Sequence, residues 1–193
     1  MEKMDYFEGN KFYKKEIIDG KSIYLLPARP EHVVIVRNLS YIFNDYFKTK
    51  DNNECDVYPD GMFLYIEGKK QRLVPDLMVI CDNSKFINRG YKGVPELIVE
   101  VISRSTFDYD IGRKKEIYEE IGVKEYWIIN PYFKDVRQYA LKNNKYELLG
   151  KFFIGEELDE YGEEIYSDEK FKTFIFPDLE VRIEDLFKSR IVY

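Results

Sequence analysis

The chain has 193 residues, of which 45% are hydrophobic and 17% aromatic, and its formal net charge is −6. A chain of this size buries about 70% of its unfolded surface, so we expect one folded domain over residues 1–193 and exclude a disordered chain. No apolar run approaches the roughly 20 residues of a membrane helix, and the charged start has no apolar signal core, so we expect no membrane partner and a cytoplasmic location.

The first elements in chain order are a hairpin and a helix. Residues 11–18 and 21–26 alternate around Asp19-Gly20, a strong two-residue turn signal, and therefore predict an N-terminal hairpin. Apolar residues recur at helical spacing over residues 31–47, which predicts an amphipathic helix. Strands are expected at 55–58 and 62–67, and the almost wholly apolar runs 77–80 and 97–102 are typical of central, buried strands.

The second half continues with a helix and more strands. Residues 108–121 predict a helix that ends at Gly122, and residues 125–129 predict another buried strand. The segments 136–141 and 146–153 flank Asn143-Asn144 as a second hairpin, the acidic stretch 156–164 is expected to be an exposed loop, and residues 176–187 predict a short strand and a helical turn. This order predicts an α+β fold around one mixed sheet: a core of about residues 30–131, the hairpin at 11–26 and a β-rich extension at 135–187.

Cysteine and histidine content restricts the possible chemistry. Cys55 and Cys81 are too few for a disulfide framework or a zinc cluster, and a reduced compartment fits them best. The single histidine, His32, excludes sites that need several histidines. Any chemistry must therefore depend on carboxylates, lysines and this one imidazole.

The charge is unevenly distributed along the chain. Between Gly68 and Lys115 there are ten basic and six acidic residues, so this window carries +4 and the rest of the chain −10. Such a window could present one basic surface to a phosphate backbone, although ordinary solvated loops explain the same residues equally well.

Two carboxylates interrupt apolar strands. Glu100 lies inside LIVEVI, where an unpaired carboxylate on a covered sheet would cost several kcal/mol, so it needs a metal, a lysine or an open cleft. Asp76 lies at the start of the run in VPDLMVI, after a proline that marks a strand end. An aspartate at that place is also common in turns.

Lys114 interrupts the predicted helix in the same way. With Ile111, Tyr118 and Ile121 it forms the stripe that should face the sheet. One interpretation is a buried Glu100–Lys114 ion pair or a lysine whose stem reaches the surface. The other is a hydrolytic site in which two carboxylates hold Mg²⁺ and a lysine stabilises the charge that develops on phosphorus.

These residues resemble a known nuclease superfamily. VPDLMVI, followed 24 residues after Asp76 by Glu100 in VEV, is similar to the PD-(D/E)xK signature. The longer strings PELIVEVISRST and DYDIGRKKEIYEEIGVKEYWIINP, with YKKEIIDGKSIYLLPARPEH near the start, resemble the Uma-type restriction endonucleases, a family of small bacterial proteins in that superfamily. The resemblance extends from about residue 11 to residue 186 and implies a restriction-endonuclease-like core.

The resemblance also implies roles for individual residues. Asp76, Glu100 and the backbone carbonyl of Val101 would bind the metal. Ile102 stands where the signature expects lysine, and Lys114, from the following helix, would replace it as the catalytic cation.

Four further residues are candidates for the cleft. Glu16 and His32 match family positions there, but Glu16 could equally form a cross-strand salt bridge, and His32 could be a helix-end or core histidine. Tyr118 shares the face of Lys114 and could hold that lysine, or belong simply to the core. Arg104 could reach a phosphate, or belong to a loop that caps the next helix.

Three functions remain open from the sequence. The first is an endonuclease that uses Mg²⁺ or Mn²⁺ to hydrolyse DNA, as a homodimer by analogy with restriction enzymes. The second is a catalytically inactive nuclease-fold module for nucleic-acid binding or assembly, which the overall acidity favours. The third, a ligand-binding α+β protein unrelated to nucleic acid, requires the motif block to be coincidence.

Overall fold

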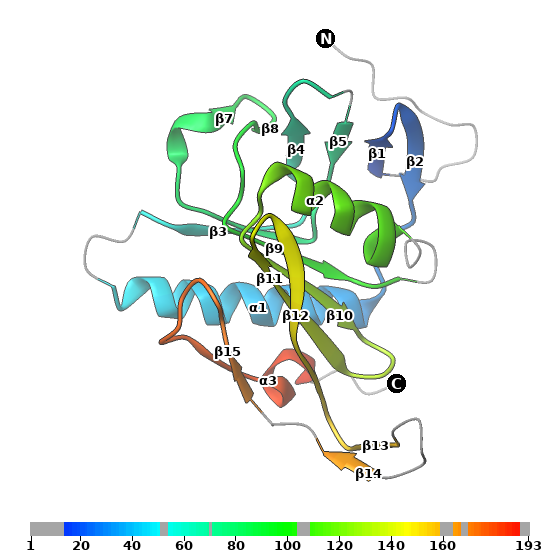
Figure 1. The fold of residues 1–193 in the computed structure, drawn as a ribbon, viewed down its shortest axis with the longest axis vertical. Helices are drawn as coiled ribbons and strands as arrows, with labels where there is room; N and C mark the ends of the chain where they lie inside the picture. The colour runs from blue at the N-terminus through cyan, green and yellow to red at the C-terminus, as the bar shows by residue number, and fades with distance from the viewer. Residues whose placement is uncertain are drawn as a thin grey trace.

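The computed structural model describes residues 14–50, 54–69, 71–103, 109–158, 164–166 and 170–189 (Figure 1). Within these ranges the strands form two six-stranded sheets and two small two-stranded ones. No helix in this part of the chain is long and apolar enough to cross a membrane.

The central sheet has the order β12-β11-β10-β9-β6-β3 and is mixed, because β9 and β10 are parallel and the other neighbours antiparallel. Its strands are β3 (Asp56–Pro59), β6 (Leu77–Ile80), β9 (Leu97–Val101), β10 (Glu125–Asn130), β11 (Asp135–Lys142) and β12 (Lys145–Phe153). The predicted mixed sheet is confirmed by this arrangement.

A second sheet, which the sequence did not predict, has the order β2-β1-β5-β4-β8-β7. Its strands are β1 (Lys14–Ile18), β2 (Lys21–Leu25), β4 (Phe63–Ile66), β5 (Gln71–Leu73), β7 (Phe86–Ile87) and β8 (Gly90–Tyr91), with a short 3₁₀ turn, η1 (Asn83–Lys85), before β7. The predicted hairpin is present over its described part, and Asp19 and Gly20 both have positive φ, as a tight two-residue turn requires. The hairpin is therefore one edge of a sheet rather than a separate extension.

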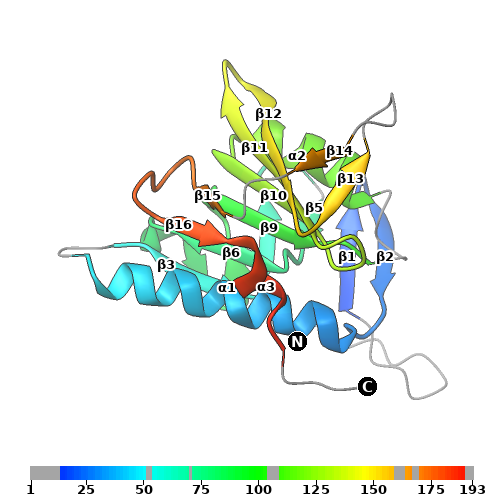
Figure 2. The same ribbon diagram turned by 90° about the horizontal axis from the view of Figure 1, so that it is seen from below.

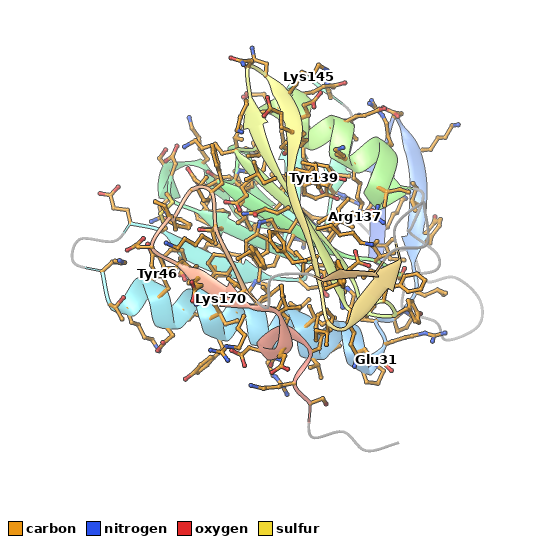
Figure 3. All side chains as sticks on the ribbon, turned by 60° about the horizontal axis from the view of Figure 1, so that its bottom comes forward. Glu31, Tyr46, Arg137, Tyr139, Lys145 and Lys170 are labelled. Carbon is orange, nitrogen blue, oxygen red and sulfur yellow. A yellow bond between two sulfur atoms is a disulfide. The ribbon has the colours of Figure 1, made fainter. Side chains whose placement is uncertain are left out.

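Helices cover the two faces of the central sheet. The predicted helix at 31–47 is α1 (Pro30–Lys48), which lies across one face beside α3 (Ile183–Phe187) (Figure 2). Glu31 and Tyr46 mark its two ends in Figure 3. On the other face, α2 (Lys115–Ile121) packs together with residues of the second sheet.

Alternation along β9 divides the core between these faces. Leu97 and Val99 pack in the cluster under α1, whereas Ile98 packs in the cluster under α2. Glu100, two residues after Ile98, therefore points to the α2 face.

The helix predicted at 108–121 is present over its described residues but is not uniform. It begins with a π-helical segment, η2 (Tyr109–Lys114), and continues as α2. Gly122 ends it in the left-handed conformation at φ 89°, as predicted. A wider π turn changes which side chains face inward, and such turns are frequent at functional sites.

Two expectations from the sequence are wrong. Cys55 and Cys81 are not two reduced thiols but form a disulfide, because the antiparallel register of β3 and β6 pairs Asp56 with Ile80 and so brings the flanking cysteines together. The acidic stretch 156–164 is not a simple loop, since its two ends pair as β13 (Glu156–Leu158) and β14 (Glu164–Tyr166), while residues 159–163 lie outside the described ranges.

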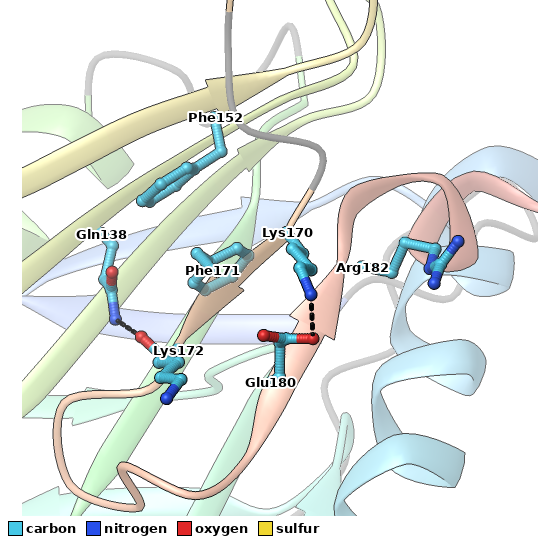
Figure 4. Close-up of a pocket in the computed structure, with 7 residues that line it drawn as sticks. All are labelled: Gln138, Phe152, Lys170, Phe171, Lys172, Glu180 and Arg182. Atoms are coloured by element: carbon cyan, nitrogen blue, oxygen red, sulfur yellow. Dashed lines mark hydrogen bonds and ion pairs between the residues drawn. The ribbon is translucent and has the colours of Figure 1, made fainter.

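The C-terminal extension leaves a pocket on the α1 side of the sheet. The pair β15 (Lys170–Lys172) and β16 (Glu180–Arg182) packs beside β11 and β12 around a volume of about 750 Å³ (Figure 4). The pocket is lined by Gln138, Phe152, Lys170, Phe171, Lys172, Glu180 and Arg182. Since Phe171 belongs to the core cluster under α1, the pocket lies across the sheet from Glu100.

A buried carboxylate fastens this extension to the sheet. Glu125 is fully buried, and its Oε1 accepts hydrogen bonds from Trp127 Nε1 and Gln138 Nε2, both at 2.7 Å. Its Oε2 accepts from the backbone N–H groups of Phe174 (2.9 Å) and Ile175 (3.0 Å). Four donors thus satisfy the charge without a cation.

We predict that Glu125→Gln lowers the free energy of unfolding by about 3 kcal/mol. The new NH₂ group would face the N–H groups that now donate to the carboxylate, so buried donors would be left without acceptors. Chemical denaturation followed by the fluorescence of Trp127 measures this change. The matched control is Glu147→Gln in an exposed Lys142 pair, for which we expect a change within about 0.5 kcal/mol. Equal stability of the two variants would contradict the structural role of Glu125.

Candidate functional site

The register of two central strands places the predicted carboxylates opposite each other. β6 and β9 are antiparallel, with Leu77 opposite Val99 and Met78 opposite Ile98. One further step along this register sets Asp76 against Glu100, and the two-residue period puts both on the α2 face. The site therefore lies at the end of the sheet where β6 begins and β9 ends.

Glu100 is buried at 1% exposure and has two donors on one oxygen. Its Oε1 accepts a hydrogen bond from Tyr118 Oη at 2.6 Å and lies 3.2 Å from Lys114 Nζ. Lys114, at 2% exposure, thus points inward, as the apolar stripe of the helix predicted. Both interpretations of Lys114 from the sequence, a closed ion pair and a catalytic cation, are compatible with this contact.

Glu16 joins the same cluster from the second sheet. It is 1% exposed, and its Oε1 lies 3.1 Å from Lys114 Nζ and accepts from the Val74 backbone N–H at 2.8 Å. Across the hairpin its neighbour is Ile23, so the alternative of a cross-strand salt bridge is wrong. Lys114 is therefore shared between two carboxylates that come from different sheets.

Asp76 is held by the start of α1. Its Oδ2 lies 3.0 Å from His32 Nε2 and accepts from the Val101 backbone N–H at 2.8 Å. Burial opposes ionisation of this carboxyl group, but His32, the charge of Lys114 and the Val101 N–H together hold its pKa below the usual value. His32 is thus placed against a candidate ligand rather than only in the core.

Tyr118 stays neutral at this position. Burial, followed by the charges of Glu100 and Glu16, raises the pKa of its phenol well above the usual value. The hydroxyl group therefore remains a donor to Glu100 at any physiological pH, as expected for a residue that orients the carboxylate.

Several cations of the basic window are already neutralised. Arg113 pairs with Asp19 and Glu116, and Lys69 with Glu120, while Lys114 is buried. The window is therefore less basic at the surface than its sequence indicates. Arg104, the candidate phosphate contact, lies outside the described residues.

The donor set is chemically suited to a hard divalent cation. Glu16 and Glu100 both contact Lys114, Asp76 lies opposite Glu100 in the strand register, and carboxylate oxygen is the ligand that Mg²⁺ prefers. Within the described ranges, no three His, Cys, Asp or Glu side chains are grouped closely enough to form a metal cage. Mg²⁺ commonly takes only one or two carboxylates and keeps several waters, so two carboxylates would be enough to hold it.

Sequence reasoning left the contacts of Glu16 and His32 undecided. Both arise from tertiary packing: Glu16 reaches Lys114 through the β1–β5 pairing that forms the second sheet, and His32 reaches Asp76 from the N-terminus of α1. The signal available in the sequence was an acidic residue at an inward hairpin position before Asp19-Gly20. Val74, whose N–H holds Glu16, carried no signal.

Comparisons with known proteins identify the family of this chain. Residues 2–161 match the Uma2 family, described as "Putative restriction endonuclease". Two uncharacterized proteins of Synechocystis sp. are similar: sll1609 is 28% identical over 139 residues, 70% of this chain and 77% of that protein, and slr1290 is 30% identical over 105 residues, 54% of each.

A solved structure supports the fold. A crystal structure from Anabaena variabilis, described as a "putative nuclease belonging to DUF820", aligns with a TM-score of 0.66 and 18% identity over 90% of this chain and 89% of that one. The architecture is accordingly the α+β, restriction-endonuclease-like fold that the sequence predicted. Because the family match spans most of the chain, the protein belongs to the Uma2 family of restriction-endonuclease-like proteins.

Proposed function

We propose that this member of a nuclease family is an endonuclease that hydrolyses DNA phosphodiester bonds with Mg²⁺ or Mn²⁺. The observation that carries the proposal is the buried Glu100, set opposite Asp76 by strand register and contacted by Lys114 at 3.2 Å. The whole chain is taken as one domain, acting as a homodimer on DNA.

Each residue has a distinct role in this proposal. Asp76, Glu100 and the carbonyl group of Val101 would hold the metal, which supplies an activated water and offsets charge on the phosphoryl group. Lys114 would stabilise that charge from the helix side. His32 orients Asp76 through the 3.0 Å contact, and Tyr118 orients Glu100 through its 2.6 Å hydrogen bond.

One observation favours a second candidate, a catalytically inactive nuclease-fold module. Glu100 and Lys114 already neutralise each other at 1% and 2% exposure, as a purely structural ion pair would. The two candidates differ in their response to a divalent ion. A metal site binds the ion and stabilises the folded protein, whereas a closed ion pair does not bind it and its stability stays the same.

We predict that the wild-type protein cleaves DNA with Mg²⁺ or Mn²⁺, and that Glu100→Gln lowers the rate at least about 100-fold. The substitution removes the charge and keeps the shape of the side chain. Supercoiled, linear and single-stranded DNA are the substrates, EDTA is the metal-free condition, and the exposed Glu147→Gln is the control that should cleave normally. Cleavage that persists in EDTA or in Glu100→Gln would contradict the assignment.

We also predict that Mn²⁺ raises the melting temperature of the wild type but not of Glu100→Gln. Binding to the folded state alone contributes about 2.7 kcal/mol at an ion concentration 100 times the dissociation constant. Thermal denaturation followed by circular dichroism over an Mn²⁺ titration measures it. No shift in the wild type, together with no cleavage, would favour the inactive module.

A further inference from the structure

One oxygen of Glu16 is buried without a partner. Oε1 is contacted by both the Val74 N–H and Lys114 Nζ, whereas Oε2 has no hydrogen-bond partner among the described residues. Buried polar atoms in folded proteins nearly always have partners, and an unsatisfied carboxylate oxygen is costly. This oxygen is therefore an acceptor that a donor within the cluster could occupy.

The ammonium group of Lys114 lies almost midway between two acceptors. Its Nζ is 3.1 Å from Glu16 Oε1 and 3.2 Å from Glu100 Oε1. A lysine ammonium carries three donors on a flexible stem, so a small rotation is enough to exchange one carboxylate for the other. The two distances are nearly equal, so they show no strong preference of Lys114 for either carboxylate.

The two carboxylates respond differently to the loss of this contact. Glu100 Oε1 keeps the hydrogen bond from Tyr118 at 2.6 Å when the ammonium group leaves. Glu16, by contrast, gains a donor for its unpartnered oxygen when the ammonium group moves toward it. If Lys114 leaves Glu100 for Glu16, one contact replaces another and the unpartnered oxygen of Glu16 acquires a donor.

We propose that Glu16 is the alternate acceptor of Lys114. A divalent cation bound at Asp76 and Glu100 would displace the ammonium group from Glu100, so that it contacts both oxygens of Glu16. This inference rests on the proposed metal site, because the cation's repulsion of the ammonium group drives the movement. Glu16 is then a positioning residue: it acts through Lys114 and leaves Glu100 available to the metal.

The first test compares crystal structures of the wild type with and without MnCl₂. We expect Lys114 Nζ to lie within about 3.2 Å of both Glu16 oxygens when Mn²⁺ is bound and to have left Glu100. Lys114 still on Glu100 beside a bound Mn²⁺ would overturn the inference. This test needs no variant and so stands even if a substitution prevents folding.

The second test measures Mn²⁺ affinity by calorimetry in a double-mutant cycle. We expect Glu16→Gln to weaken binding about tenfold or more, but only about threefold or less in the Lys114→Met background, where no ammonium group needs a place. If Glu16 attracts the ion only through space, its loss costs as much or more without Lys114, and that result overturns the inference.

Two controls complete this cycle. Glu31→Gln removes an exposed charge beside His32 at the start of α1 (Figure 3), and we expect it to leave Mn²⁺ affinity unchanged. Measuring at about pH 7 and about pH 9 shows whether a carboxyl group takes up a proton when Lys114 is replaced. The cycle supports the inference only if Glu16→Gln costs less Mn²⁺ affinity in the Lys114→Met background than in the wild type at both pH values. If this difference between the backgrounds disappears at the higher pH, the result counts against the inference.

Failure of the inference and failure of the proposed function give different results. If the wild type does not bind Mn²⁺, or Glu100→Gln binds it equally well, the metal site itself is wrong. If Glu100→Gln abolishes binding but Glu16→Gln costs the same in both backgrounds, the metal site stands and only the role of Glu16 is wrong.

Discussion

The burial of two glutamates around one ammonium group is the constraint on which this end of the molecule depends. Glu16 and Glu100 are 1% exposed and Lys114 is 2% exposed. Removing charges from water costs several kcal/mol per ion even after relaxation, so each must find compensation nearby. The surrounding elements are arranged to supply it: a tyrosine hydroxyl and a backbone N–H group contact the two glutamates, and His32 contacts Asp76.

Three features of the fold converge to make that arrangement. The β6–β9 register sets Asp76 against Glu100, the second sheet carries Glu16 over the same face, and the π-helical segment η2 delivers Lys114 at its end. Because these elements are held by pairing and packing elsewhere in the core, the fold itself positions the charged side chains.

Local patterns predicted the parts of the site that depend on one element. Glu100 stood out because a two-residue period put it on a buried face, and Lys114 because it interrupted a helical stripe. Both arguments need only the geometry of a single strand or helix. They also predicted α1 and the two hairpins, whose turns at Asp19-Gly20 and Asn143-Asn144 take the positive φ that tight turns demand.

Contacts between distant segments were beyond such patterns. The second sheet contains strands of only two or three residues, such as β7 and β5, which are too short to show a period. The role of Glu16 depends on that sheet, and the Cys55–Cys81 disulfide depends on the β3–β6 register. The acidic composition of residues 156–164 indicated exposure but not the pairing of β13 with β14.

The two kinds of buried glutamate in this chain help to distinguish structure from function. Glu125 is satisfied by four neutral donors and fastens the C-terminal extension, so its environment is complete as it stands. The Oε2 atom of Glu16 is buried without a donor among the described residues, and Lys114 Nζ contacts both Glu16 and Glu100. A core selected for stability alone gains little from such a cluster, because apolar residues of similar volume are often as stabilising. The incomplete satisfaction of Glu16 distinguishes this cluster from the environment of Glu125, and it is the feature that the proposed movement of Lys114 would remove.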